Sequence, residues 1–345
     1  MQNESTKKQR IPAIEALRFL SIFQICLWHM SWPSMEAGFL GVEFFFILSG
    51  TFLYKNATKQ NSPGVLSYTL CKLRKFWFKI ILALIWTYIV FIQDIITQFQ
   101  EDRLHPILRF ISDSLLLSDI GSFEGAFNYP TWFFSVLIYG GALVYTLTKY
   151  YTKISIRIIF PIIAISYFAF TFKNGTQVTL ENWGVSVLFP LSLIRGICEM
   201  GFGVIIGYLY FNNSDKLHIK AFNFILVVSI ILYLAIIING RQFSQYAFIF
   251  IPVLICAALT NNTVLSKLLQ GNYWRSLGLI SFDLFIIHGP LIALFRHFFL
   301  VEAGLPIWIC GTLYTIVLIP CAFFFDKVAV YIQKALFSPN KRTIS

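Results

Sequence analysis

The sequence predicts an all-α protein integral to a membrane, and three observations support this prediction. Hydrophobic residues make up 57% of the 345 residues and charged residues only 12%, whereas a soluble domain carries about 25% charged residues. The apolar residues gather into runs of about 20, the length that spans a bilayer as a helix. The net charge of +11 comes from Lys and Arg placed between those runs. This pattern fits charge asymmetry across a membrane and offers no aromatic-rich basic patch for nucleic acid.

About ten apolar runs are candidate transmembrane helices. In chain order they cover residues 13–31, 38–54, 76–93, 131–148, 154–172, 187–211, 219–238, 244–260, 276–297 and 305–325. The first run follows Lys7, Lys8 and Arg10 in the manner of a signal peptide. Arg18 interrupts this run early and no clear cleavage site follows it, so we expect a retained signal-anchor helix. The second run is short and the sixth is long, which predicts tilt in one and a break in the other.

The connecting segments alternate in positive charge. The two ends of the chain and segments 55–79, 149–157, 212–220 and 261–275 together hold 20 of the 27 Lys and Arg. Because cytoplasmic segments carry the excess of positive charge, both termini are predicted to be cytoplasmic. We expect one membrane domain over residues 1–335 and a short cytoplasmic tail over residues 336–345.

The longest connecting segment, 94–130, is predicted to face outward, and part of it is amphipathic enough to lie at the membrane interface. Such long loops are uncommon without a function, so this one either helps to bind an acceptor or is a solvated connector.

Charged residues inside the predicted spans are the first candidates for chemistry, because burying charge in a bilayer is costly. Arg18 and His29 are eleven positions apart in the first span, which places them on one helix face and about 16 Å apart along the axis. Glu43 enters the second span at a depth close to that of His29. A neutral imidazole can accept a hydroxyl proton, and a nearby carboxylate can orient it. The alternatives are that Arg18 snorkels to the interface, that Glu43 pairs with Arg18, and that His29 is an ordinary interfacial histidine.

Two further pairs are candidates for support rather than catalysis. Arg195 and Glu199 are four residues apart, a spacing that suits an ion pair neutralising two buried charges. Asp283 and His288 are five apart and share a helix face poorly. His288 precedes Gly289-Pro290, where a local break in the helix is expected. The six cysteines are scattered without metal-ligand spacing, so no metal site is predicted. No permanently bound cofactor is expected either.

Several motifs, in this order, resemble those of the acyltransferase 3 family of membrane proteins. They are Arg18-Phe19-Leu20-Ser21-Ile22 with Trp28-His29, Gly41-Val42-Glu43-Phe44-Phe45-Phe46-Ile47-Leu48-Ser49-Gly50, Pro130-Thr131-Trp132-Phe133-Phe134-Ser135, Arg195-Gly196-Ile197-Cys198-Glu199-Met200-Gly201-Phe202-Gly203, and the segment from Gly278 to His288. The resemblance covers nearly the whole chain. Glu43 stands where the family has Asp, and His29 is single where many members have two His.

The resemblance implies an O-acyltransferase that moves an acetyl or other acyl group from cytoplasmic acetyl-CoA (acyl-CoA) to a hydroxyl outside the membrane. The catalytic residues would be His29, Glu43 and Arg18. The donor would be held by Arg18 and by the basic residues Lys72, Arg74 and Lys75, the nearest equivalent of the family's cytoplasmic Arg-x-x-Arg. Ser49, Trp132, Arg195, Glu199 and His288 would support the substrate or the fold.

The resemblance further implies a multi-pass protein of a bacterial cytoplasmic membrane. Its acceptor would be a cell-surface polysaccharide, such as capsule or O-antigen, or a lipid-linked oligosaccharide. The chain ends soon after its last predicted span, so the expected form lacks an extracytoplasmic domain. Direct transfer and a covalent acyl-histidine route both fit, and the oligomeric state stays open. The rival functions are a transporter or flippase of lipid-linked glycans, and a sensor or scaffold built on an inactive acyltransferase fold.

Overall fold

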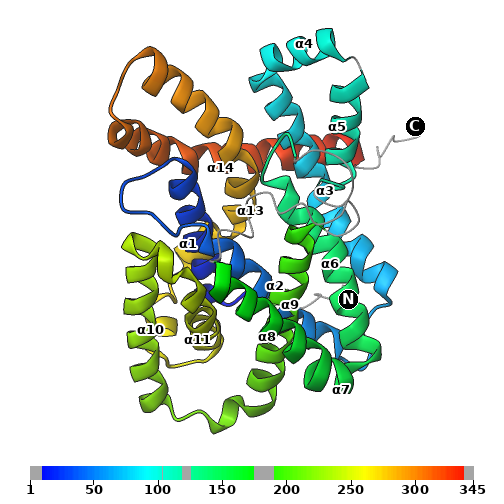
Figure 1. Ribbon diagram of the computed structural model, residues 1–345, viewed down its shortest axis with the longest axis vertical. Helices are drawn as coiled ribbons and strands as arrows, with labels where there is room; N and C mark the ends of the chain where they lie inside the picture. The colour runs from blue at the N-terminus through cyan, green and yellow to red at the C-terminus, as the bar shows by residue number, and fades with distance from the viewer. Residues whose placement is uncertain (1–9, 103, 119–125, 175–189, 338–345) are drawn as a thin grey trace, which may run out of the picture.

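The computed structural model describes residues 10–102, 104–118, 126–174 and 190–337, and all of the regular structure in these ranges is helical (Figure 1). In chain order the elements are α1 Pro12–His29, α2 Leu40–Ala57, α3 Val65–Val90, α4 Ile92–Glu101, α5 Leu104–Ser114, α6 Thr131–Tyr150, α7 Thr152–Ile154, η1 Ser155–Ile159, α8 Phe160–Asn174, α9 Leu191–Asn213, η3 Ser214–Lys216, α10 Ile219–Asn239, η4 Arg241–Tyr246, α11 Ala247–Leu259, α12 Val264–Leu268, α13 Asn272–Phe295, η5 Arg296–Glu302 and α14 Ile307–Phe337. The all-α prediction is therefore confirmed for the described ranges.

Seven helical segments in the described ranges are long and apolar enough to cross a membrane, or eight if α3 and α4, which meet at an 80° bend, form one span. Helices α1 and α2, each 18 residues long, are not among these seven. The chain thus has the helices of a multi-pass membrane protein. The total of ten spans and the cytoplasmic side of both termini stay predictions.

The structure corrects three details of the sequence analysis. Helix α3 begins at Val65 rather than near residue 76, so the basic residues at 72–75 lie on a helix and not in a loop. The predicted outer loop contains helices α4 and α5, which project together beyond the other helices (Figure 1). Helix α13 continues through Gly289 and Pro290 instead of breaking there. The start of the sixth predicted run, at 187, and residues 338–345 of the predicted tail lie outside the described residues.

Helices α2 and α9 pack closely at the centre of the molecule, because glycine leaves room for two backbones to approach (Figure 1). A side chain at Gly50 would meet the carbonyl of Met200, and one at Gly203 would meet the carbonyl of Ile47. Helix α1 lies against α13, where Gly278 faces Glu15. These contacts bring the polar residues of α1, α2, α9 and α13 into one central region.

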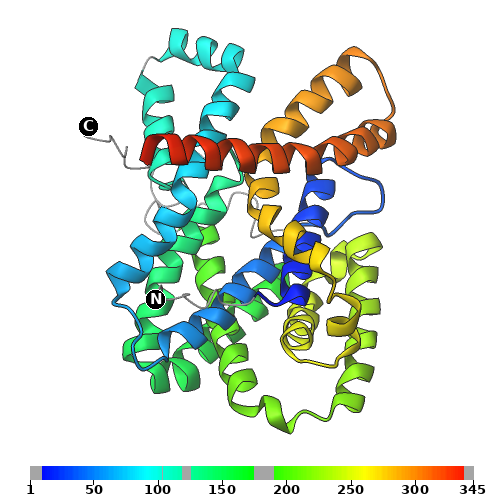
Figure 2. The ribbon, with the colours of Figure 1, turned by 180° about the vertical axis from the view of Figure 1, so that it is seen from behind.

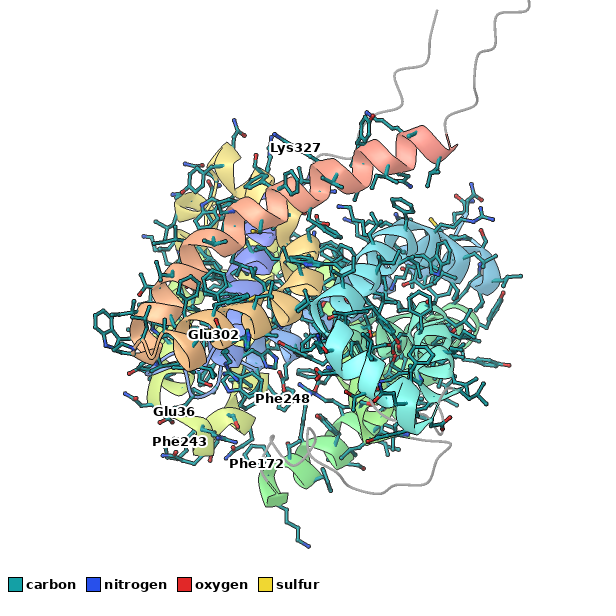
Figure 3. All side chains as sticks on the ribbon, turned by 90° about the horizontal axis from the view of Figure 1, so that it is seen from above. Glu36, Phe172, Phe243, Phe248, Glu302 and Lys327 are labelled. Carbon is teal, nitrogen blue, oxygen red and sulfur yellow. The ribbon has the colours of Figure 1, made fainter. Side chains whose placement is uncertain are left out.

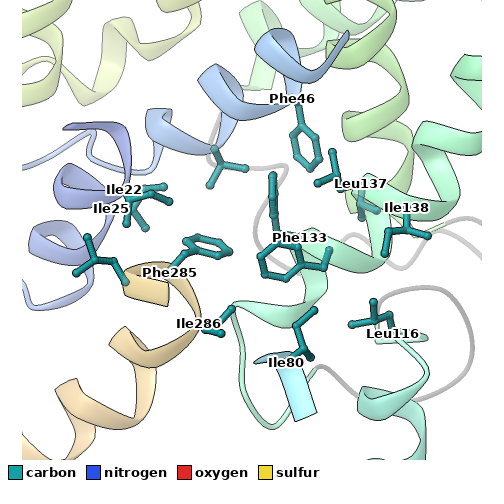
Figure 4. Close-up of a cluster of buried hydrophobic side chains, with 14 of the residues drawn as sticks. Ile22, Ile25, Phe46, Ile80, Leu116, Phe133, Leu137, Ile138, Phe285 and Ile286 are labelled. Atoms are coloured by element: carbon teal, nitrogen blue, oxygen red, sulfur yellow. The ribbon is translucent and has the colours of Figure 1, made fainter. Parts of the chain in front are cut away.

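An aromatic and aliphatic core fills the space between α1, α6 and α13. Phe285 lies between Ile25 and Phe133 in Figure 4, and the Phe133 and Phe285 rings are 5.4 Å apart. Helix α14 runs across the back of this region (Figure 2). At the rim, large apolar side chains such as Phe172 and Phe243 are about half exposed (Figure 3). Exposed apolar side chains suit a surface that faces lipid, since hydrocarbon and not water would surround them.

Candidate active site

Two cavities meet at the centre of the helices. The larger has a volume of about 650 Å³. Its lining contains several basic residues, so it is called here the basic cavity. The smaller, of about 260 Å³, contains His29 and is called the histidine cavity. Three residues, Ile25, Val42 and Phe285, line both cavities and therefore form the partition between them.

One face of α1 runs along both cavities. Arg18, Ile22 and Ile25 line the basic cavity, and His29 lines the histidine cavity four residues beyond Ile25. At 1.5 Å per residue the partition lies about 10 Å along the axis from Arg18 and about 6 Å from His29. The prediction that Arg18 and His29 share a helix face is confirmed, because they border two adjoining cavities that are both lined by Ile25 of the same helix.

The basic cavity carries an excess of positive charge. Among its described lining residues, five are basic and one is acidic; the basic ones are Arg10, Arg18, Lys55, Lys72 and Lys75. The carboxylate is Glu15, which pairs with Arg18 at 3.0 Å and with Arg10 at 3.3 Å. Arg18 therefore pairs with Glu15 and not with Glu43. The arrangement offers charge to an anionic ligand at one end and apolar walls at the other.

The predicted donor-binding residues of α3 divide into two groups. Lys72 and Lys75 line the basic cavity, and the Lys72 Nζ lies 4.8 Å from the centre of the Tyr68 ring. Arg74 is exposed on the same helix and is not among the described lining residues. Ser49, predicted as a supporting residue, lines the basic cavity.

The rings of His29, Tyr129 and His288 lie together in the lining of the histidine cavity. The His29 ring lies 4.7 Å from Tyr129 and 5.3 Å from His288, measured between ring centres. Tyr129 meets His288 edge-on at 5.2 Å. Trp132 lines the same cavity. The structure thus joins His29 and His288, which are 259 positions apart in the sequence.

A cation holds the end of the helix that carries His29. Arg296 donates hydrogen bonds of 2.8 Å to the backbone carbonyl of His29 and to the Ser31 hydroxyl. The last carbonyls of a helix lack partners within the helix and carry partial negative charge, so a guanidinium satisfies both needs. This contact ties the backbone at His29 to η5, the segment that follows α13.

Glu43, predicted to orient His29, has a different partner. Its Oε1 accepts a 2.6 Å bond from Arg195, whose Nε also donates to Glu199 at 3.1 Å. The Tyr167 hydroxyl donates to the same Glu199 oxygen at 3.0 Å. The i,i+4 pair of Arg195 and Glu199 is therefore confirmed, with Glu43 as an added member. The guanidinium carbon of Arg195 also lies 5.8 Å from the centre of the Trp132 ring, which connects this network to the cavity wall.

Sequence reasoning missed three residues at this site: Tyr129, Arg296 and Glu15. Tyr129 directly precedes the Pro130 to Ser135 motif, which was the available signal for it. Glu15 and Arg296 were visible as charges at the edges of apolar runs, but nothing in the sequence shows which partners they reach. Asp283 joins Lys79 at 2.8 Å, and Lys79 also joins Asp326 at 2.6 Å, so this cluster ties α3, α13 and α14 together.

Comparisons with known proteins found one matching family and several curated relatives. The family model described as "Acyltransferase domain" matches residues 11–324. Two curated relatives, each named "Putative O-acetyltransferase", come from Staphylococcus aureus strains COL and MSSA476. Each is 22% identical over 346 residues, which covers 88% of this chain and 54% of the relative. The chain thus spans about half the length of the curated relatives that it matches. No solved structure matches the chain.

Proposed function

The chain belongs to the acyltransferase domain family, and we propose that it transfers an acetyl or similar short acyl group from cytoplasmic acyl-CoA to a hydroxyl of a cell-surface glycan. The observation that carries this proposal is the pair of cavities separated only by Ile25, Val42 and Phe285. A thioester that reaches the partition from the basic cavity would lie next to the cavity of His29. Two substrates could therefore enter from different directions and meet at one point.

The basic cavity suits coenzyme A. The donor carries several phosphates, which Arg18, Lys72 and Lys75 can bind as hydrogen-bonding cations. The apolar end, lined by Ile22, Phe133 and Phe285, suits the uncharged pantetheine arm of the donor, which ends in the thioester.

The reaction requires one acyl transfer and two proton transfers, one to His29 and one from it. His29 takes the proton as the acceptor O–H bond breaks, and the hydroxyl oxygen forms a bond to the thioester carbon. The carbon–sulfur bond then breaks, and the thiolate of coenzyme A takes up the proton. Positioned general bases contribute about 10²–10⁴-fold to such rates.

The acceptor is proposed to be a polysaccharide or a lipid-linked oligosaccharide outside a bacterial cytoplasmic membrane. Two features support this: the relatives named O-acetyltransferases occur in a bacterium, and His29 lies at the end of α1 opposite to the basic residues. The membrane domain is proposed to include residues 1–335.

The test uses purified full chain in lipid nanodiscs with acetyl-CoA labelled in the acetyl group. We expect release of free coenzyme A and labelled glycan when membrane glycan is supplied. Labelled acetyl retained on His29 without acceptor would identify a covalent two-step route. No coenzyme A release, combined with movement of lipid-linked glycan across the bilayer, would replace this proposal by the transporter function.

A further inference from the structure

His288 is the most unusual polar residue near the site. Its side chain is completely buried on α13, and its Nδ1 lies 2.5 Å from the carbonyl oxygen of Phe285. A carbonyl only accepts hydrogen bonds, so Nδ1 must carry the hydrogen. In the neutral ring Nε2 is then a bare acceptor.

Within the described part of the chain, no group forms a hydrogen bond with this Nε2. A buried acceptor without a partner loses its hydrogen bonds to water without replacement, and such groups in native proteins call for an explanation. His29 lies across the histidine cavity, with its ring centre 5.3 Å from that of His288 and the planes tilted by 35°. At this separation two ring nitrogens come within hydrogen-bonding distance only when they point at each other, and the described structure has no bond between the two rings.

The surroundings of His288 hold it in place. Asn128 donates a 3.0 Å bond to the carbonyl of Ile286, which ties the Tyr129 turn to this part of α13. The Phe285 ring packs against Phe133 at 5.4 Å and Phe134 at 5.6 Å. Because the His288 ring is held in one position and in one tautomer, it can set the orientation of the His29 ring.

We propose that His288 is a positioning residue for His29, with its Nε2 accepting a hydrogen bond from a ring N–H of His29. This inference rests on the proposed function. The bond holds one nitrogen of His29 as the donor and leaves the other bare toward the acceptor hydroxyl, and it stabilises the imidazolium that forms. Hydrogen bonds of this kind are often long in the empty enzyme and shorten when substrate binds. Glu43 does not fill this role in the present arrangement: it bonds Arg195 through Oε1 and is not among the described residues that line the histidine cavity.

Two substitutions separate positioning from other roles. In His288→Gln the amide oxygen takes the place of Nε2 and can accept the bond but no proton. In His288→Asn the amide nitrogen takes the place of Nδ1 and can donate to Phe285, but nothing accepts from His29. We expect kcat to fall about 10²-fold or more in the Asn variant and less than about 10-fold in the Gln variant, with the KM for acetyl-CoA unchanged in both. The matched controls are His218→Gln and His218→Asn, which alter an exposed histidine before α10.

Equal losses in both variants would overturn the positioning role and make His288 itself the proton acceptor. Unchanged kcat in a folded Asn variant would overturn any part in the reaction. A second measurement needs no activity: nitrogen-15 spectra of histidine-labelled protein, with His29 identified by its loss in His29→Ala. We expect a single tautomer of His29 in the native chain and in His288→Gln, and a mixture in His288→Asn. A mixture already present in the native chain would reject the inference. If the native chain transfers no acetyl group, the proposed function fails, while these spectra still decide whether the two rings are coupled.

Discussion

Glu43 on α2 and Arg195 on α9 are joined by a fully buried ion pair of 2.6 Å. Arg195 also pairs with Glu199 at 3.1 Å, so within the described residues one guanidinium serves two carboxylates. Removal of one member of a buried ion pair costs about 3–5 kcal/mol, because the remaining charge loses its partner. The pair therefore holds α2 and α9 together at the level of the site and makes the first prediction possible.

Arg195→Met should destabilise the protein more than Glu43→Gln. The methionine leaves two buried carboxylates without their cation, whereas glutamine keeps a polar group that can accept from Arg195. The measurement is the midpoint temperature of thermal unfolding in detergent. The control is Lys173→Met, which changes an exposed side chain. A midpoint for Arg195→Met equal to that of the native chain would contradict the structural role of this network.

His29→Ala should reduce acyl transfer by about 10²–10⁴-fold while the protein accumulates normally in the membrane, since the side chain is only half-buried beside a cavity. His29→Gln should not restore activity, because an amide cannot accept a proton at neutral pH. Acetylation is measured per amount of membrane protein, and His218→Ala is the control. Native acetylation by His29→Ala would exclude His29 as the base.

Lys72→Gln and Lys75→Gln should raise the KM for acetyl-CoA, and Arg74→Gln on the same helix should do so much less. The reason is position: the two lysines line the basic cavity and Arg74 does not. The increase in KM for Arg18→Lys should lie between those of the lysine variants and of Arg74→Gln, because lysine keeps the charge but loses the planar set of donors. Steady-state kinetics at varied donor concentration make the comparison. A larger effect at Arg74 than at Lys72 would place the donor outside the cavity.

The sidedness of the helices can be tested with single cysteines at Gln242, Asp215 and Asn261. These positions are exposed and lie between the ends of helices α9 to α12. In a background with the exposed Cys71 replaced by serine, a cysteine at Gln242 should react with an impermeant thiol reagent from outside intact cells. Cysteines at the other two positions should react only after lysis. The reverse pattern would invert the predicted topology, and a mixed pattern would remove the alternation of spans.

The sequence determined the class of the protein and most of the candidate site residues, because these depend on local properties. In a bilayer, an apolar run of this length forms the hydrogen bonds of its own backbone N–H and C=O groups only as a helix. The eleven-residue spacing of Arg18 and His29 sets their shared face through helix geometry alone. The four-residue spacing of Arg195 and Glu199 predicted their ion pair in the same way.

Only the tertiary structure decided which of these residues meet. Glu43 bonds Arg195 instead of approaching His29, because glycines at positions 50 and 203 let α2 and α9 pack closely. His288 and Tyr129 come to His29 from two distant segments, and the partition between the cavities needs α1, α2 and α13 at once. Such contacts depend on how complete helices pack against one another. No spacing within a single helix contains that information.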